Sequence, residues 1–226
     1  MTSSRLPGKV MAPVLGQPMI ARQVERLRRS QRLDHLVLAT SLEASDDPLA
    51  SYAQGAGLDM VRGDLNDVLS RFGAVLDGFP QASTVVRLTA DCPLTDWRVL
   101  DQVIDLLELG GSDYVNNTGP ERTFPHGLDV EAMKASVLRQ AVATATTAYD
   151  REHVTPLIYN APERFKVSHL TRAPSLAHLR WTVDYPDDLA FVREVYGKLH
   201  AADPDFGTEA VAALTPNSAP LQTPGG

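Results

Sequence analysis

The chain has 226 residues, 43% of them hydrophobic and 22% charged, which is ordinary for a globular protein and allows one large α/β domain or two small ones. The net charge of −7 and the lack of a basic stripe exclude duplex nucleic acid as the expected partner. No stretch is long and apolar enough to span a bilayer. The start lacks an apolar signal core, and the single cysteine, Cys92, cannot form an internal disulfide, so we expect a cytoplasmic protein.

The first part of the chain alternates amphipathic helices with apolar strands. In residues 18–30, Ile20, Val24 and Leu27 recur at helical spacing. The run HLVLAT (35–40) is typical of a buried parallel strand. Three further elements are expected: a helix that starts at 46–48 and ends near Gly55 or Gly57, a strand over 58–63 and a helix over 66–79.

The alternation continues in the second part. The clearest strand is 84–88, and it breaks at Asp91-Cys92-Pro93. A helix is expected over 96–111, strands over 112–117 (SDYVNN), 127–133 (GLDVEAM) and 178–184 (HLRWTVD), and helices over 134–148, 152–160 and 186–200. This order predicts a mostly parallel sheet covered on both faces, in a single domain over 1–214, with a disordered tail over 215–226.

The loop SSRLPGK (3–9) carries two cations next to a tight turn at Pro7 and Gly8. Backbone N–H groups in such turns can face an anion, Arg5 can donate to two phosphate oxygens, and Lys9 adds a point charge. The spacing is not that of a Walker loop. Polyphosphate binding therefore competes with a simple solvated basic terminus.

Two aspartates follow apolar strands. Asp91 lies in RLTADCPL (87–94), just past the expected strand 84–88, and Asp184 ends RWTVD (180–184). Ligands of open α/β sheets bind at this edge, and such carboxylates commonly hold Mg²⁺, so the two could converge on one divalent ion. Capping of a turn before Pro93 is the alternative for Asp91. Cys92 is expected to be a small apolar filler rather than a nucleophile.

Two later motifs, FPHGLDVEA (124–132) and REHVTP (151–156), contain further polar candidates. Gly127 before a strand indicates close approach of a ligand to the backbone. Asp129 and Glu131 alternate and would share one face of the strand. Arg151 and His153 precede or open a helix, and surface solvation is the alternative for all of these charged residues.

Taken in order, the motifs SSRLPGKVM, VLATS, RGDLNDVLSRF, RLTADCPL, DYVNNT, FPHGLDVEAM, REHVTPLIY and LRWTVDYPDDL closely resemble the SpsF-type cytidylyltransferases. These belong to the nucleotidyltransferase superfamily that includes synthetases of CMP-activated acidic sugars. The resemblance runs from about residue 3 to about residue 199. It implies a three-layer α/β/α, Rossmann-like nucleotide-diphospho-sugar transferase fold with a mostly parallel central sheet.

The resemblance also implies roles for individual residues. Arg5, Lys9, Asp91 and Asp184 would be catalytic, and Asp91 and Asp184 would be the Mg²⁺ ligands. The implied nucleotide site comprises Ser4, Arg5, Gly8, Lys9, Arg62 and Asp91. The implied sugar site comprises His126, Gly127, Asp129, Glu131, Arg151 and His153. His126 stands where relatives often have Asp, which departs from the family pattern on the sugar side.

In similar proteins an apolar strand runs into the N-terminal loop, and the central sheet is built around it. Here only Met1 and Thr2 precede the loop. We therefore expect Met1 to be an internal methionine, with the natural start about ten residues upstream, a strand plus a short loop. A truncated, inactive paralogue is the alternative.

The implied reaction is transfer of CMP from CTP to a sugar, acidic or modified, with release of pyrophosphate, in surface polysaccharide, spore-coat or glycan synthesis. Partners would be CTP, Mg²⁺ and the acceptor sugar, with a homodimer as the default assembly. Two alternatives stay open. One is a glycosyltransferase, whose D-x-D candidate here is Asp203-Pro204-Asp205. The other is a non-catalytic nucleotide-binding protein.

Overall fold

The structure is a computed structural model that describes residues 5–215. The expected phosphate contact of Ser4 and most of the expected disordered tail, 216–226, lie outside the described residues. None of the helices in the described part is both long and apolar enough to cross a membrane.

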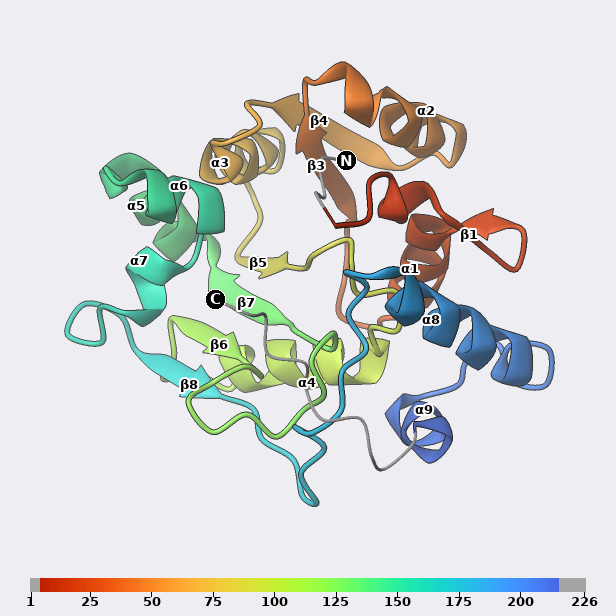
Figure 1. The fold of residues 1–226 in the computed structure, drawn as a ribbon. Helices are drawn as coiled ribbons and strands as arrows, with labels where there is room; N and C mark the ends of the chain where they lie inside the picture. Colours follow the sequence, from red (N-terminus) through yellow and green to blue (C-terminus); the bar gives the residue numbers. More distant parts are fainter. Residues whose placement is uncertain (1–4, 216–226) are drawn as a thin grey trace.

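Helices and strands alternate through most of the described chain (Figure 1). The strands are β1 (Pro13–Val14), β2 (Gln17–Pro18), β3 (Val37–Ser41), β4 (Asp59–Gly63), β5 (Thr84–Arg87), β6 (Tyr114–Asn116), β7 (Glu131–Lys134) and β8 (Val167–His169). The helices are α1 (Met19–Leu27), α2 (Asp47–Gly55), α3 (Val68–Gly78), α4 (Trp97–Glu108), α5 (Ala135–Thr144), α6 (Ala148–His153), α7 (Pro156–Tyr159), α8 (Pro186–Leu199) and α9 (Thr208–Leu214), with short 3₁₀ turns η1 (Lys9–Met11) and η2 (Ala44–Asp46).

The main strands fall into two groups. β3 and β4 pair in parallel, and a four-stranded sheet has the order β5-β7-β6-β8. In that sheet β6 and β8 are parallel, whereas β7 is antiparallel to both β5 and β6. Reversal of β7 leaves β5, β6 and β8 running the same way, so the expectation of a mostly parallel sheet is confirmed.

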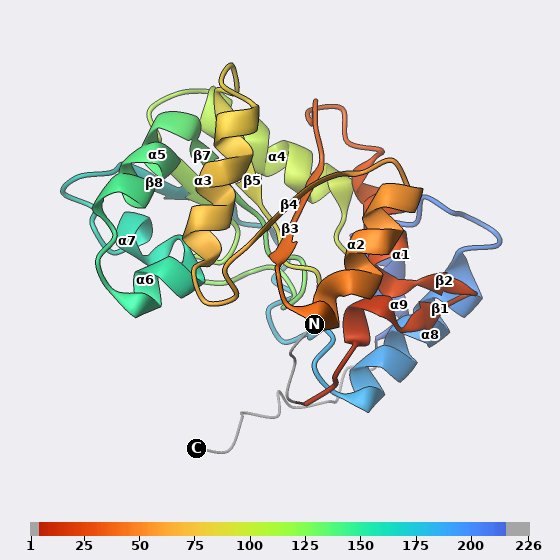
Figure 2. The ribbon, with the colours of Figure 1, turned by 90° about the horizontal axis from the view of Figure 1, so that it is seen from above.

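Helices cover both faces of the sheet. Val115 and Ala132 pack with α4 and Leu27 of α1, while their neighbours Tyr114 and Met133 pack with α3, α5 and α7. Because successive strand side chains point to opposite faces, this division defines three layers. In Figure 2, β5 lies between α3 and α4. The expected three-layer α/β/α fold is confirmed.

A slot of about 890 Å³ separates the two groups of strands. Residues 35–39 line it on the β3 side and residues 83–90 on the β5 side, with side chains of α1 and α3 above and below. Within the described residues, β3 pairs only with β4 and β5 only with β7. Two neighbouring strand edges are thus left open.

Two elements expected from the sequence are wrong. The segment 178–184 is not a strand but forms one isolated bridge, between His126 and Arg180. Its alternating apolar residues, Leu179, Trp181 and Val183, are buried against α8 and α9 rather than in a ladder. The expected helix over 152–160 is interrupted at Val154, whose φ of +73° separates α6 from α7.

Candidate active site

Lys9 lies at the centre of the candidate site. Its Nζ lies 3.1 Å from Oδ1 of Asp184 and 3.4 Å from Oδ2 of Asp91, and it donates to the carbonyl of Val183 at 2.6 Å. One ammonium group therefore uses its three protons on two carboxylates and one carbonyl that lie 82 to 175 positions away in sequence. The structure thus brings together Lys9, Asp91 and Asp184, which we call the carboxylate cluster.

Local backbone geometry aims Lys9 at this point. Gly8 has a φ of +72°, a conformation that favours glycine, and directly precedes η1. The amide of Lys9 donates to the carbonyl of Leu6 at 3.2 Å and that of Met11 to the carbonyl of Gly8 at 2.9 Å. This compact turn, rather than a fully extended tail, carries Lys9 to the carboxyl end of β5.

Asp184 is surrounded by cations. Arg5 contacts its Oδ1 at 3.1 Å, and Arg180 contacts its Oδ2 at 2.7 Å. Burial by itself would raise the pKa of Asp184, but the hydrogen bond and charge of Lys9, together with the charges of Arg5 and Arg180, outweigh it and hold the pKa below its ordinary value. Asp184 therefore remains ionised at neutral pH.

Asp188 fixes the backbone that carries Asp184. Its Oδ2 accepts from the amides of Asp184 and Tyr185, both at 2.8 Å, and its Oδ1 pairs with Arg180. This carboxylate caps the start of α8, as expected for an acidic residue in a first helical turn.

Asp91 follows β5 and is tied by backbone contacts to the same segment. The amide of Val183 donates to the carbonyl of Asp91 at 2.8 Å, so the two aspartate-bearing loops lie side by side. Cys92 is 4% exposed, and its burial and the charge of Asp91 raise the pKa of its thiol well above the ordinary value. A protonated, buried thiol is a filler, not a nucleophile.

Gly127 meets backbone instead of a ligand. Its φ is +99°, and a Cβ at this position would lie 2.4 Å from the amide nitrogen of Thr182. The carbonyl of the neighbouring His126 accepts from the amide of Trp181 at 2.6 Å, and the amide of His126 donates to the carbonyl of Leu179 at 3.0 Å. Residues 126–127 therefore bind the segment that ends at Asp184, and the close approach expected for Gly127 is to protein backbone.

Asp129 and Glu131 have different partners. Asp129 forms an ion pair with Arg122 at 2.6 Å. Glu131 pairs with Arg87 across the β5–β7 ladder at 2.9 Å and accepts from the hydroxyl of Thr155 at 3.2 Å. Burial, then the charge of Arg122, lowers the pKa of His126, so its ring is neutral at neutral pH.

Three other expected residues are engaged elsewhere. Arg62 donates to the carbonyl of Ser41 and pairs with Asp47 at 2.8 Å, around the turn between β3 and α2. Arg151 pairs with Asp67 at the start of α3 at 2.7 Å. The exposed His153 packs on the ring of Tyr149, 4.4 Å between centroids. None of these contacts, all within the described residues, joins the three to the carboxylate cluster.

Sequence reasoning missed Arg180, Arg87 and Thr155. Each of the three lies inside a motif in which the sequence analysis singled out a different residue, so the motif itself could have indicated it. Arg180 stands four positions before Asp184, and Arg87 four before Asp91. The D-x-D candidate does not belong to the site, because Asp205 is held by Trp97 at 2.8 Å and by Arg98 at 2.6 Å.

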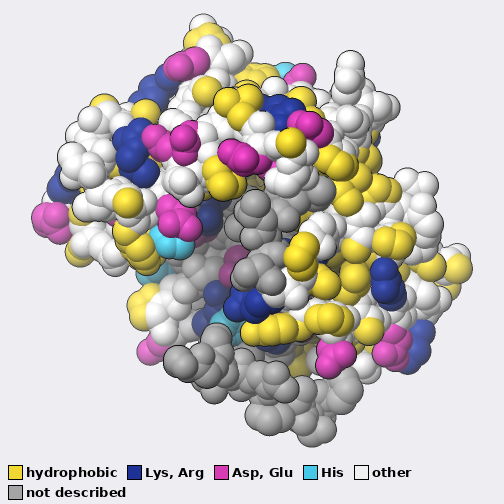
Figure 3. Space-filling view, turned by 45° about the horizontal axis from the view of Figure 1, so that its top comes forward, with side chains coloured by type: hydrophobic (Ala, Val, Ile, Leu, Met, Phe, Trp, Pro, Cys, Tyr) yellow, Lys and Arg dark blue, Asp and Glu magenta, His cyan; other side chains and the backbone are white. Residues whose placement is uncertain are grey.

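The carboxylate cluster lies where segments from distant regions of the chain meet. Figure 3 shows acidic, basic and histidine side chains gathered in a hollowed part of one face. An arrangement in which cations face two carboxylates has the chemistry to bind an anion together with a metal ion, which is what phosphoryl-group transfer uses.

Comparison with known proteins shows the family of the chain. A family model described as cytidylyltransferase matches residues 1–195. The chain belongs to the cytidylyltransferase family. It is therefore an enzyme of the nucleotidyltransferase class, and the resemblance inferred from its motifs is confirmed.

Three relatives illustrate the relationship. The spore coat polysaccharide biosynthesis protein SpsF of Bacillus subtilis is 31% identical over 227 residues, which cover 96% of this chain and 91% of that protein. The structure of a cytidylyltransferase from Leptospira borgpetersenii matches with a TM-score of 0.87 and 28% identity, over 95% of this chain and 89% of that one. Rv0371c from Mycobacterium tuberculosis, solved in complex with manganese, shares the fold at 18% identity and a TM-score of 0.57, over 84% of this chain and 93% of that one.

Proposed function

We propose that the protein transfers CMP from CTP to a hydroxyl group of an acidic or modified sugar, with Mg²⁺ as cofactor and pyrophosphate as the second product. The observation that carries this proposal is the meeting of Lys9, Asp91 and Asp184 at the carboxyl end of β5, in a member of the cytidylyltransferase family. Arg5 at the same cluster adds the second cation for the phosphates.

The residues of the cluster fit a magnesium ion. Among residues 5–215 no group of three or more potential metal ligands occurs, but Mg²⁺ is commonly held by one or two carboxylates and completes its shell with water and substrate phosphates. The Lys9 ammonium, in contact with both Asp91 and Asp184, indicates that a cation is favourable between them. Rv0371c, which shares the fold, forms a complex with manganese, another divalent ion with similar ligands.

When bound, the metal ion would neutralise the phosphate oxygens that repel an attacking hydroxyl. Lys9 and Arg5 would hold the β- and γ-phosphates and stabilise the charge that grows on pyrophosphate as its bond to the α-phosphorus breaks. The acceptor oxygen forms the new bond to that phosphorus and loses its proton to solvent. Arg180 would keep Asp184 ionised and oriented throughout. The chain needs no covalent intermediate.

The acceptor side is assigned to residues 126–131 and their partners. Arg122 and Arg180 lie near His126, and their guanidinium groups could donate to a sugar carboxylate in place of part of their contacts with Asp129, Asp184 and Asp188. A neutral His126 ring can both donate and accept hydrogen bonds. SpsF is named for spore coat polysaccharide synthesis, and a role in surface polysaccharide or glycan assembly is proposed by analogy. We also propose a cytoplasmic location, which the single cysteine supports.

The test is pyrophosphate release from CTP with Mg²⁺ and a panel of acidic and neutral sugars, compared with UTP, ATP and GTP. We expect release with CTP and at least one acidic sugar, and its loss on chelation with EDTA. If the folded protein binds CTP by calorimetry but none of the sugars in the panel leads to release of pyrophosphate, the proposed reaction is wrong. Release in the presence of EDTA would contradict the role of the metal.

A further inference from the structure

Each strand of the four-stranded sheet carries a polar residue at the same edge. Arg87 ends β5, Asn116 ends β6 and His169 ends β8. β7 runs the other way and begins with Glu131 at this edge. The register places all four in one line across the sheet, which we call the polar row, in the order Arg87, Glu131, Asn116 and His169. This is the carboxyl edge of the parallel strands, where open α/β sheets bind their ligands.

One step further into the sheet, the same face is apolar or aromatic. Side chains two positions apart along a strand share a face. The line next to the polar row consists of Val85, Met133, Tyr114 and Val167. These side chains pack in the core under α3, α5 and α7. The polar row borders that core: Asn116 is 4% exposed, and the side chains of Arg87 and Glu131 are 20% and 12% exposed. Polar groups in such surroundings need partners.

Hydrogen bonds within the polar row hold its groups in place. The Nη1 of Arg87 donates to Oε2 of Glu131 at 2.9 Å. The Oδ1 of Asn116 lies 2.8 Å from Nδ1 of His169, so the buried amide fixes the imidazole ring. Gly119 leaves room for that ring, because a Cβ at this position would lie 2.4 Å from Cγ of His169. The row is thus preorganised, as a recognition site requires.

A strained turn adds one more group to the polar row. Val154 has a φ of +73° and a ψ of −55°, and the amide of Thr155 donates to the carbonyl of His153 at 2.9 Å, which together make a γ-turn of the rare, strained kind. A β-branched residue seldom adopts a positive φ. The turn directs the hydroxyl of the buried Thr155 to Glu131, 3.2 Å from Oε1 and 3.3 Å from Oε2. Backbone strain of this kind clusters at binding and catalytic sites.

The chemistry of the polar row suits hydroxyl groups. Arg87 and Glu131 form an ion pair, so their charges neutralise each other. Within residues 5–215, neither Nη2 of Arg87 nor Nε2 of His169 has a hydrogen-bond partner, and His169 is exposed. A hydroxyl both donates and accepts a hydrogen bond. Ring and guanidinium nitrogens on either side of a carboxylate therefore match a polyol better than they match an ion.

The polar row lies close to the carboxylate cluster. Asp91 follows Arg87 by four residues, which span at most about 14 Å. Residues 126–131 also connect the two, because 126–127 bind the segment that ends at Asp184 and Glu131 begins β7. The row itself spans about 14 Å, three spacings between strands, so a single pyranose ring covers only part of it. A longer hydroxyl-bearing chain can lie along the row while another hydroxyl of the same molecule lies at the carboxylate cluster.

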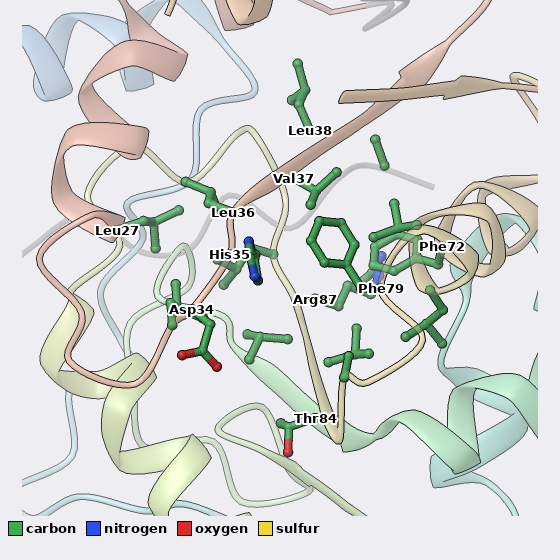
Figure 4. A pocket seen from close by; sticks show the side chains of 18 of the residues that line it. Leu27, Asp34, His35, Leu36, Val37, Leu38, Phe72, Phe79, Thr84 and Arg87 are labelled. Carbon is green, nitrogen blue, oxygen red and sulfur yellow. The ribbon is translucent and has the colours of Figure 1, made fainter. Parts of the chain in front are cut away.

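The slot between β3 and β5 does not offer this chemistry. Figure 4 shows Leu27, Leu36, Phe72 and Phe79 among the side chains that line it. Walls of this kind leave the hydroxyls of a polyol without partners, and burial of an unpaired hydroxyl is unfavourable. A polyol is therefore expected at the polar row and not in the slot.

We propose, resting on the proposed function, that the polar row binds hydroxyl groups of the acceptor sugar that are remote from the hydroxyl attacking CTP. Arg87, Glu131 and His169 contact these hydroxyls. Thr155 is a positioning residue that fixes the carboxylate of Glu131. The acceptor class is thus a sugar with an extended polyhydroxy chain, longer than a single pyranose ring.

A binding experiment tests the polar row without catalysis. Sorbitol, an open-chain polyol, is compared with hexane-1,6-diol, which has the same number of carbons but hydroxyls only at its ends. We expect sorbitol to shift the ring-proton NMR signals of His169, identified by their loss in His169→Phe, and the diol to leave them in place. The exposed His35, before β3, is the internal control and should not respond to sorbitol. No shift of His169 by sorbitol, or equal shifts by both compounds, would overturn the proposal.

Kinetic variants separate the polar row from the proposed function. With an acceptor that supports pyrophosphate release, Glu131→Gln, Thr155→Val and His169→Phe should each raise the KM for the acceptor about tenfold, the scale for one lost hydrogen bond to a charged group, and leave the KM for CTP unchanged. Thr155→Ser keeps the hydroxyl and should restore the KM. His35→Phe keeps a ring on Phe79 and should change neither KM.

The two proposals fail in different ways. An acceptor KM that stays unchanged in all three variants would overturn the role of the polar row, while transfer of CMP would stand. A response of His169 to sorbitol without pyrophosphate release from any acceptor would support the polar row as a polyol site and contradict the proposed function.

Discussion

The two halves of the central layer differ in how completely their strands are paired and buried. We call the part around β6 and β7 the closed half, and the part around the slot, with β3 and β5, the open half. Around β6 and β7, both strands have partners on both sides, and Tyr114, Val115, Ala132 and Met133 are all fully buried. Around the slot, β3 and β5 each have one partner within residues 5–215, and the four residues of β5 are only half-buried. The apolar pattern of both regions is similar, so the difference arises from what pairs with each strand and not from local sequence.

This contrast reaches the candidate active site, because the carboxylate cluster joins the two halves. Asp184 ends the segment that residues 126–127 of the closed half bind, and its backbone amide donates to the carboxylate of Asp188. Asp91 follows β5 on the open half, and Lys9 and Arg5 belong to the N-terminal loop. Hydrogen bonds and ion pairs therefore hold the site residues of both halves, and Lys9 links the two by contacting Asp91 and Asp184.

The largest expected effect tests whether the two halves act as one site. We expect Asp91→Asn and Asp184→Asn each to reduce kcat at least about a hundredfold, the scale for loss of one electrostatic group at a reacting phosphate. The exposed Asp187, three positions from Asp184, is the matched control, and Asp187→Asn should keep near-normal turnover. Pyrophosphate release measures all three. Normal turnover in Asp91→Asn alone would show that the open half takes no part in catalysis.

The second prediction concerns residues 126–127 of the closed half, where Gly127 lies against the backbone of Thr182. Gly127→Ala places a Cβ 2.4 Å from the amide nitrogen of Thr182, and the contact is with backbone that cannot rotate away. Gly111 has nearly the same φ, +96° against +99°, but no atom within 4 Å of the added Cβ. Strain of this kind costs on the order of 1–3 kcal/mol, so we expect Gly111→Ala near the lower end and Gly127→Ala at or above the upper end. Urea unfolding of both variants measures the loss of unfolding free energy. Equal losses would contradict the close contact between Gly127 and the backbone of Thr182.

Sequence reasoning succeeded where a polar residue ends an apolar run of the sequence. The motifs indicated the family and the fold class, and the ends of two apolar runs indicated Asp91 and Asp184, which the structure places on one ammonium group. The roles of these residues remain predictions. In the structure only Asp91 follows a strand; Asp184 ends a run that is not one, and the amide of Val183 holds it beside Asp91 by donating to the Asp91 carbonyl.

Sequence reasoning failed where the position of a side chain depends on a partner far away in the sequence. Arg151 contacts Asp67, 84 positions away, which no local pattern specifies. The segment 178–184 alternates like a strand because Trp181 and Val183 are buried against helices. Alternation reports which side chains are buried, and a ladder is only one of the structures that bury every second residue.

A third prediction compares packing in the two halves directly. Val115 is fully buried in β6, whereas Val86 of β5 lines the slot and is half-buried. Val115→Ala should cost roughly 2 kcal/mol of unfolding free energy because it leaves a cavity in a closed region, and Val86→Ala about 1 kcal/mol or less because its surroundings are already open. Chemical denaturation measures both. Equal costs would show that the slot is closed in solution.

The smallest expected effect concerns the charge that keeps Asp184 ionised. Arg180 lowers the pKa of Asp184, so Arg180→Leu should move that pKa upward, towards its ordinary value. Asp184 must be ionised to act, and turnover falls as it is protonated. The acid limb of the kcat–pH profile should therefore shift to higher pH in Arg180→Leu.

Two variants separate charge from packing in that result. Arg180→Lys keeps a cation four positions before Asp184 and should restore most of the original acid limb, although it cannot contact Asp184 and Asp188 with the same forked geometry. Arg193 donates to the carbonyl of Pro13, away from Asp184, so Arg193→Leu should leave the profile unchanged. An acid limb that moves equally in all three variants would mean that general destabilisation, rather than the field of Arg180, sets the pH response. If Arg180→Leu alone moves it, the charge of Arg180 governs the ionisation of Asp184, while hydrogen bonds to Asp188 fix its backbone.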